Sequence, residues 1–165
     1  MNKIVAIFSH DAGGAELVSL WVKKHNYNYI THIDGPAKKV FERNNIKEKQ
    51  YSLDDAIKNC NWIFCSTSWQ SEIEKEAILK AKIHRKKSIS FLDHWVNYRE
   101  RYIYKGNLNL PDEIWVTDNY AKNLILNEFP KAKIRLVKNP YFENSINQIN
   151  KIKLKNKFKN KLKKN

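Results

Sequence analysis

Apolar and polar residues follow two different periods along this chain, and the two periods predict strands and helices in turn. Short strand-like runs, most of them apolar and bounded by polar or glycine-containing segments, occupy residues 3–8, 29–33, 49–51, 62–65, 88–92, 113–116 and 134–137. Apolar residues spaced by three and four positions are typical of amphipathic helices, and they occupy residues 15–25, 37–44, 52–58, 71–84 and 119–129. Strands that alternate with helices in this way indicate βαβ units and therefore a parallel sheet.

These elements predict an α/β fold, namely a three-layer, Rossmann-like domain with a mostly parallel sheet of about six or seven strands. The chain has 165 residues, of which 42% are hydrophobic, which is enough for one folded core. Its apolar runs are all shorter than the roughly 20 residues that a membrane-spanning helix needs, and the first strand begins at once, without a signal peptide. We therefore expect a cytoplasmic protein, with Cys60 and Cys65 as small core side chains.

Positive charge is concentrated at the end of the sequence. The net charge is +14, and residues 144–165 hold eight lysines and no acidic residue. We expect a Rossmann-like domain over residues 1–143, followed by a lysine-rich tail or basic helix over residues 144–165. Leu154, Phe158 and Leu162 share one face if the tail is helical, which suits the anionic inner face of a membrane; a frayed lysine- and asparagine-rich terminus is the alternative. Nucleic acid is not an expected partner, because charge alone carries no specificity.

The polar segment 9–16 carries the first candidate chemistry, because it lies between a predicted strand and a predicted helix. His10 and Asp11 are proton-transfer side chains, and Gly13 and Gly14 allow a tight turn with free N–H groups at the start of the helix. The spacing matches neither the G-x-G-x-x-G dinucleotide-binding pattern nor the P-loop. The alternative is a purely structural turn in which Asp11 caps the helix.

Four further predicted strands end in polar loops, at residues 34–36, 66–70, 93–98 and 117–119. The carboxyl ends of parallel strands share one edge of a sheet, and ligands bind there at the point where the strand order reverses. Ser66, Thr67 and Ser68 offer hydroxyls to an anionic or hydroxyl-rich ligand, or a cap for the next helix.

The loop after residue 92 is the densest in candidate groups. We expect Trp95 and Tyr98 to stack on a sugar or base, and Arg99 or Arg101 to pair with a phosphate or carboxylate; the alternative is that the rings cover the sheet edge. Neighbouring residues rarely face each other, so we expect Asp93, rather than Asp11, to orient His10 across this edge. No metal site is predicted, because the H-x-x-x-H, H-E-x-x-H and C-x-x-C spacings are missing from the sequence.

Residues 4–16, 91–98 and 111–118 resemble the amino-terminal domain of GT-B type glycosyltransferases. More narrowly, they are similar to glycosyltransferase-like proteins of bacterial surface carbohydrate biosynthesis. Residues 133–142 resemble the last strand of that domain and its exit toward a second domain, so the resemblance covers about residues 3–143.

The resemblance implies a Rossmann-like domain that binds an acceptor sugar or glycan, with His10 as the catalytic base, Asp11 as a second candidate and Asp93 as an orienting carboxylate. The implied substrate-binding residues are Gly13, Gly14, Glu16, Ser66, Thr67, Ser68, His94, Trp95, Asn97, Tyr98 and Arg101. No cofactor is implied beyond a nucleotide sugar as co-substrate, and we expect the donor to bind a separate domain.

Two other functions stay open at this point. One is half of a sugar-nucleotide epimerase or hydrolase, which shares the two-domain architecture. The other is a non-catalytic Rossmann-like module that binds a nucleotide or glycan.

Overall fold

The computed structural model describes residues 3–162, with side chains described for residues 3–153. The strands are β1 (Ile4–Ser9), β2 (Asn28–Ile33), β3 (Trp62–Cys65), β4 (Lys87–Phe91), β5 (Ile103–Tyr104), β6 (Asn107–Leu108), β7 (Glu113–Val116) and β8 (Ile134–Leu136). The helices are α1 (Ala12–His25), α2 (Ala37–Arg43), α3 (Leu53–Asn59), α4 (Ile73–Ile83), α5 (Asn119–Glu128) and α6 (Pro140–Leu162). None of the helices in this part of the chain has the length and hydropathy to span a bilayer.

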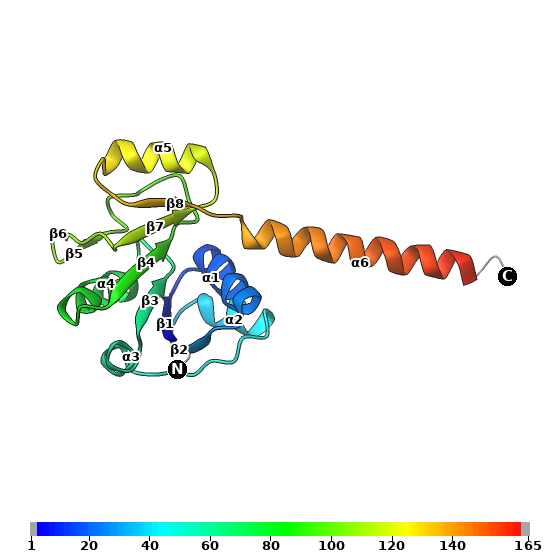
Figure 1. Ribbon diagram of the computed structural model, residues 1–165, viewed down its shortest axis with the longest axis horizontal. Coiled ribbons are helices and arrows are strands. Elements are labelled where there is room, and N and C mark those ends of the chain that lie inside the picture. Colours follow the sequence, from blue (N-terminus) through cyan, green and yellow to red (C-terminus); the bar gives the residue numbers. More distant parts are fainter. Residues whose placement is uncertain (1–2, 163–165) are drawn as a thin grey trace.

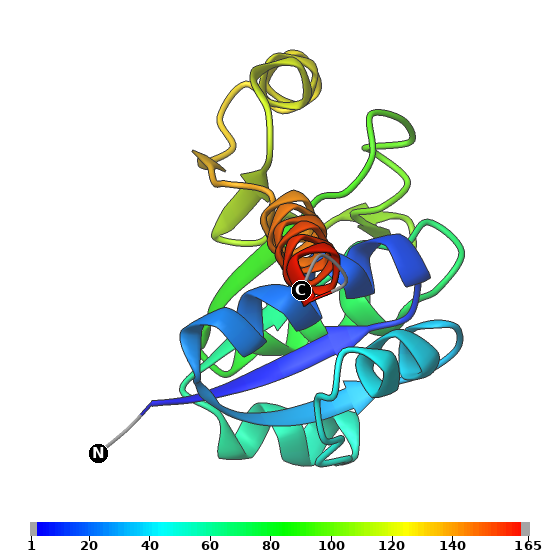
Figure 2. The ribbon, with the colours of Figure 1, turned by 90° about the vertical axis from the view of Figure 1, so that its right-hand side faces the viewer.

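Six of these strands form one all-parallel sheet in the order β2-β1-β3-β4-β7-β8, while β5 and β6 form a separate antiparallel hairpin. Helices α1 and α2 pack on one face of the sheet, and α3, α4 and α5 pack on the other (Figures 1 and 2). This arrangement confirms the predicted Rossmann-like α/β fold and its three layers.

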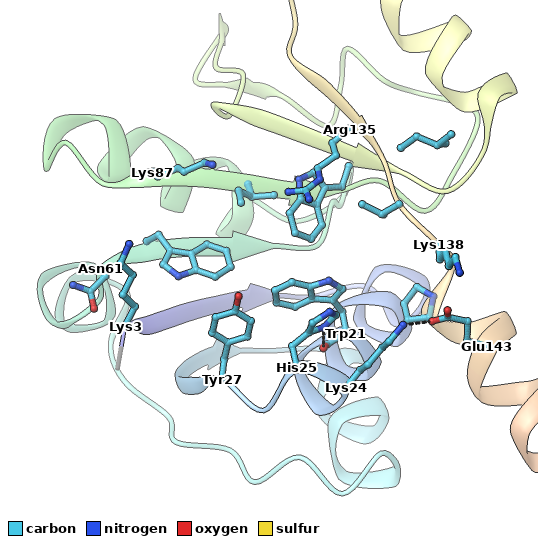
Figure 3. Close-up of a pocket in the computed structure, with 16 residues that line it drawn as sticks. Lys3, Trp21, Lys24, His25, Tyr27, Asn61, Lys87, Arg135, Lys138 and Glu143 are labelled. Carbon is cyan, nitrogen blue, oxygen red and sulfur yellow. Dashed lines mark hydrogen bonds and ion pairs between the residues drawn. The ribbon is translucent and has the colours of Figure 1, made fainter. Parts of the chain in front are cut away.

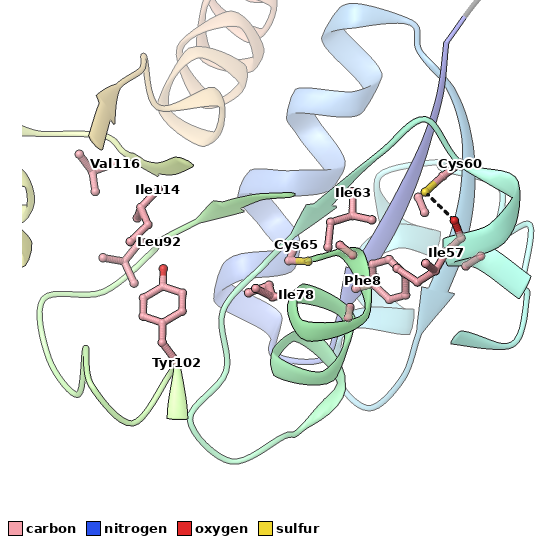
Figure 4. Packing of buried hydrophobic residues seen from close by; sticks show 14 of the residues in the cluster. Phe8, Ile57, Cys60, Ile63, Cys65, Ile78, Leu92, Tyr102, Ile114 and Val116 are labelled. Carbon is pink, nitrogen blue, oxygen red and sulfur yellow. Dashed lines mark hydrogen bonds between the residues drawn. The ribbon is translucent and has the colours of Figure 1, made fainter. Parts of the chain in front are cut away.

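The core divides into two clusters because side chains along a strand alternate between the faces of the sheet. In β1, Ala6 and Phe8 join the α3–α4–α5 cluster, whereas Val5 and Ile7 join the α1–α2 cluster. Figure 4 shows Phe8 packed in the first cluster near Cys60 and Cys65. Both thiols are free and buried, which confirms that the cysteines are small core side chains.

Two short segments differ from the sequence prediction. Residues 49–51 do not form a strand: they make one isolated bridge, between Thr31 and Gln50, beside the edge strand β2. The β5–β6 hairpin was not predicted, although Lys105 and Gly106 at its turn both have positive φ (48° and 78°), as a type I′ turn requires.

Helix α6 begins at Pro140 and projects from the body of the molecule (Figure 1). The predicted boundary between residues 143 and 144 falls inside its first turns. The apolar stripe predicted from Leu154, Phe158 and Leu162 lies outside the residues whose side chains are described.

Candidate functional site

The strand order reverses between β1 and β3, because the chain continues from β1 to β2 on one side and to β3 on the other. The loops at the carboxyl ends of the strands contact one another in a row along this edge. Ser9 Oγ lies 2.9 Å from Ser66 Oγ, Thr67 Oγ1 lies 3.4 Å from Asp93 Oδ1, and the Trp95 indole donates to Asp118 over 3.3 Å. The expectation that five polar loops share one edge is confirmed, since the Asp34 amide also donates to the carbonyl of Ser9.

His10 and Asp11 form a side-chain pair in the loop between β1 and α1. His10 Nδ1 lies 2.8 Å from Asp11 Oδ1, and each side chain is 27% exposed. Our expectation that Asp93 orients His10 is wrong. Asp11 has an extended backbone (φ −81°, ψ 146°) and makes no side-chain cap to α1, so its carboxylate is free to turn back toward the imidazole. The interpretation of Asp11 as a side-chain cap is wrong for the same reason.

Glycines allow the loops of this edge to approach closely. A Cβ on Gly35, whose φ is +56°, would lie 2.5 Å from His10 Nε2. A Cβ on Gly14 would lie 2.6 Å from Ser66 Cβ, and one on Gly13 would collide with the Asp93 carboxylate. Because these positions lack side chains, the imidazole packs on the loop after β2, and the first turn of α1 packs on the ends of β3 and β4.

Asp93 is the centre of a second charged cluster, one strand further along the edge. Its side chain is 5% exposed, and its oxygens lie 3.2 Å from His94 Nε2 and 3.7 Å from Arg101 Nη1. Burial raises the pKa of Asp93, while the nearby His94 and Arg101 act in the opposite direction. Arg101 is itself buried and also donates to the Thr67 carbonyl and hydroxyl over 3.2 and 3.1 Å. Because Arg101 is buried and bonded to the loop after β3, the structure does not support the predicted pairing of Arg101 with a ligand phosphate.

Glu74, in the first turn of α4, is a residue of this edge that the sequence analysis missed. Its side chain is buried, and Oε1 accepts from the His10 amide (3.0 Å) and from the Ser66 hydroxyl (2.8 Å). Burial raises the pKa of Glu74. The carboxyl group thus ties the end of β1 to the end of β3. An acidic residue at the start of a helix is common, so nothing in the sequence marked this one.

The three hydroxyls predicted to bind a ligand instead form hydrogen bonds with other residues of the protein. Ser66 bonds to Glu74 and Ser9, and Thr67 bonds to Arg101. Ser68 accepts from the amides of Gln70 and Ser71, so it caps the turn that precedes α4. All three residues are buried. Their role in the structure is therefore to hold the loop after β3.

The other predicted binding residues are placed differently from one another. His94 and Trp95 are exposed at the edge, and Asn97 adopts a left-handed backbone with φ of 57°. Tyr98 is buried, and burial raises its pKa to about 12. Glu16 points toward α2, where it contacts Arg43 and accepts from Asn44 Nδ2 over 3.0 Å. His10, Asp11, His94, Trp95 and Asn97 are thus predicted residues that reach the surface with groups suited to a ligand.

A cavity of about 910 Å³ lies away from this edge, on the α1 face of the sheet. Figure 3 shows Trp21, His25 and Tyr27 along one wall, with Arg135 and Lys87 opposite. The Trp21 and Tyr27 rings stack with centroids 5.2 Å apart, and the Arg135 guanidinium lies 5.2 Å from the Trp115 ring centre. This surface was not predicted from the sequence, because a tryptophan in a strand or helix is also an ordinary core residue.

Buried Glu113 supports one wall of this cavity and makes a pH-dependent contribution to stability. Its carboxylate accepts from Lys133 (2.7 Å), Trp115 Nε1 (3.1 Å) and Lys87 (3.1 Å), and these bonds, that from Lys133 foremost, lower its pKa from 4.5 to about 2. A lowered pKa in the folded state stabilises the protein above pH 4.5, and this contribution is lost as the pH falls toward 2.

The variant Glu113→Gln is therefore expected to be less stable than the parent protein at pH 7, with a difference that narrows between pH 4.5 and pH 2. Urea unfolding at a series of pH values measures this difference. Glu128→Gln, which removes an exposed partner of Arg99, is the control and should show little pH dependence. A difference that stays constant over this range contradicts the assigned role of Glu113.

Among the described residues, no group of three or more histidine, cysteine, aspartate or glutamate side chains is arranged to hold a metal ion. In comparisons with known proteins, no family model, curated protein or solved structure matches the chain. The assignment that the structure supports is that of an α/β domain with a six-stranded parallel, Rossmann-like sheet.

Proposed function

We propose that the chain is a glycosyltransferase-like domain that binds a sugar or glycan acceptor at the carboxyl edge of its sheet, with His10 as the general base. The observation that carries this proposal is the pair formed by His10 and Asp11 at the point where the strand order reverses. This is the position at which open α/β sheets bind their ligands.

The geometry of the pair suits proton abstraction. A carboxylate can only accept a hydrogen bond, so in the neutral imidazole of His10 this pair favours the hydrogen on Nδ1 and the lone pair on Nε2. No hydrogen bond from another described residue occupies Nε2. An acceptor hydroxyl placed against Nε2 would transfer its proton there while its oxygen forms a bond to the anomeric carbon of the donor. The bond from that carbon to the nucleoside diphosphate breaks in the same step, and Asp11 stabilises the imidazolium that results.

The exposed side chains of the neighbouring loop supply a binding surface for the acceptor. Trp95 presents a large ring for stacking on a sugar, and His94 offers a polar group beside it. The indole N–H of Trp95 donates to Asp118, and this hydrogen bond orients the ring at this edge. Asp93, Glu74 and Arg101 act behind this surface as positioning residues, because their side chains are buried and bonded to the loops that carry it.

A non-catalytic glycan-binding module is the second candidate. This candidate is favoured because Thr67, Ser66 and Arg101 form hydrogen bonds within the protein, which leaves few polar groups at this edge free to act on a substrate. The two candidates share the acceptor surface and differ only in the role of His10.

The first experiment is a thermal-shift measurement with acceptor glycans, free nucleotides and nucleotide sugars. A binding glycan at about 100 times its Kd should raise Tm by about 5 °C or more. We expect Trp95→Ala to abolish the shift, while His10→Gln and the remote control His84→Gln retain it. Stabilisation by nucleotide sugars alone, or a glycan shift that survives Trp95→Ala, would overturn the assignment of the acceptor to this edge.

A further inference from the structure

On the α1 face, the described helices leave the end of the sheet at β8 exposed, and the cavity lies beside it. Ile89 of β4, Trp115 of β7 and Val137 after β8 line the cavity. On the opposite face the same strands are covered by α4 and α5. Parallel sheets of this type are normally covered by helices on both faces. The exposed side chains of Tyr27 and Leu136 at the cavity are therefore unusual for this architecture.

This surface continues beyond the first cavity. A second cavity, of about 450 Å³, shares Lys24, Pro140 and Glu143 with the first and extends between α1 and α6 to Ile146. Ile146 lines this second cavity, and both Ile146 and Ile149 are exposed on α6, the helix that projects from the body. The two cavities together form an elongated groove with α1 along one side. We call this surface the α1–α6 groove, and its length suits a polypeptide segment better than a compact ligand.

The charge of the groove is strongly positive. Its cationic lining residues are Lys3, Lys23, Lys24, Lys87, Arg135 and Lys138. The acidic lining residue Glu143 is already paired with Lys24 over 2.7 Å. Lys87 is held by buried Glu113, and Arg135 lies over the Trp115 ring, so two of the cations have fixed positions at the rim. An occupant must therefore combine an apolar face with acidic flanks.

We propose that the α1–α6 groove binds an acidic amphipathic helix of a partner protein. Leucine-type side chains of that helix would contact the exposed side chains of Tyr27 and Leu136, and its carboxylates would pair with Arg135, Lys138 and Lys3. The basic helix α6 of a second copy does not satisfy this requirement, because its lysines would face the lysines of the groove. The groove is separate from the carboxyl edge, so the proposal does not depend on the proposed function.

The test uses the full chain and three synthetic 20-residue peptides. The first has leucine at helical spacing i, i+3, i+4, i+7 and glutamate at the other positions. The second replaces every glutamate by lysine, and the third is the acidic peptide with a central proline that breaks the helix. Indole N–H signals in ¹⁵N NMR report where each peptide binds. Among the five tryptophans, Trp21, Trp62 and Trp115 line the groove, whereas Trp69 and Trp95 lie in loops at the carboxyl edge.

We expect only the intact acidic peptide to bind, with shifts of the three groove indoles and unchanged signals for Trp69 and Trp95. The double variant Arg135→Glu/Lys138→Glu should weaken its affinity at least tenfold. The matched control Lys39→Glu/Lys58→Glu changes charge equally on exposed lysines of α2 and α3 and should bind as the parent protein does. If the double variant fails to fold, Leu136→Ser tests the apolar part of the groove instead.

Four results would overturn the proposal. The first is equal binding of the acidic and lysine peptides, and the second is unchanged affinity in both groove variants. The third is stronger binding of a dT20 oligonucleotide, or of vesicles containing phosphatidylserine, with shifts at the same indoles. The fourth is concentration-dependent dimerisation, measured by light scattering, that shifts these indoles without any peptide.

Discussion

Replacing His10 by glutamine is expected to lower the rate of sugar transfer to an acceptor hydroxyl by about 10²- to 10⁴-fold, with little change in acceptor affinity. Glutamine keeps a donor for the Asp11 carboxylate but has no group that takes up a proton near neutral pH. The rate is measured as kcat with the nucleotide sugar and glycan selected by binding, with a donor domain added in trans if the chain alone is inactive.

His32→Gln is the matched control, because His32 is also a histidine at a sheet edge but bonds to the Tyr51 carbonyl, away from Asp11. Its kcat should equal that of the parent protein. Asp11→Asn should also reduce kcat, because an amide N–H that donates to Nδ1 favours the tautomer in which Nε2 carries the hydrogen and cannot accept a proton. Full activity of His10→Gln would exclude the general-base role and leave the binding module as the remaining candidate.

Replacing Arg101 by methionine is expected to lower the free energy of unfolding by about 3 to 5 kcal/mol, because Asp93 loses its buried cationic neighbour. Arg101 and Asp93 have side chains that are 2% and 5% exposed. The loss should shrink as the pH falls, since protonation neutralises the buried Asp93 carboxyl and so removes the uncompensated charge. Urea unfolding followed by circular dichroism measures the effect.

The double variant Arg101→Met/Asp93→Asn should recover part of this loss, because no buried charge then remains at Asp93. Arg99→Met is the control. Its guanidinium pairs with Glu128 at the surface, so its removal should cost less than about 1 kcal/mol. A loss in Arg101→Met as small as that in Arg99→Met would show that Asp93 does not depend on Arg101.

The main elements of the fold could be predicted from the sequence because the core is built from continuous apolar runs. Residues 62–65 and 113–116, for example, were predicted as strands and are buried strands in the sheet. Ser52 was predicted to begin a helix, and its hydroxyl accepts from the Asp55 amide over 3.1 Å. Residues 49–51 were wrongly predicted as a strand, because they pair with β2 through a single bridge, between Gln50 and Thr31, and do not continue the sheet.

The position of the candidate site could also be predicted, but the partners of its side chains could not. The carboxyl ends of parallel strands lie at one edge of the sheet whatever residues the loops contain. The proximity of the loops could therefore be predicted from the strand topology. The pairing of His10 with Asp11 depends on the backbone angles of Asp11, which no spacing rule gives. The roles of Glu74 and Arg101 depend on burial, and a charged residue in a sequence gives little sign of being buried.

The projecting helix α6 also determines how the protein behaves in a hydrodynamic experiment. At 1.5 Å per residue, its 23 residues extend about 35 Å, comparable to the diameter of a small domain. A monomer of 19.6 kDa with such an extension has a high frictional ratio and elutes early in gel filtration, as a compact dimer would. Its mass in solution therefore has to come from light scattering or sedimentation equilibrium, which do not depend on shape.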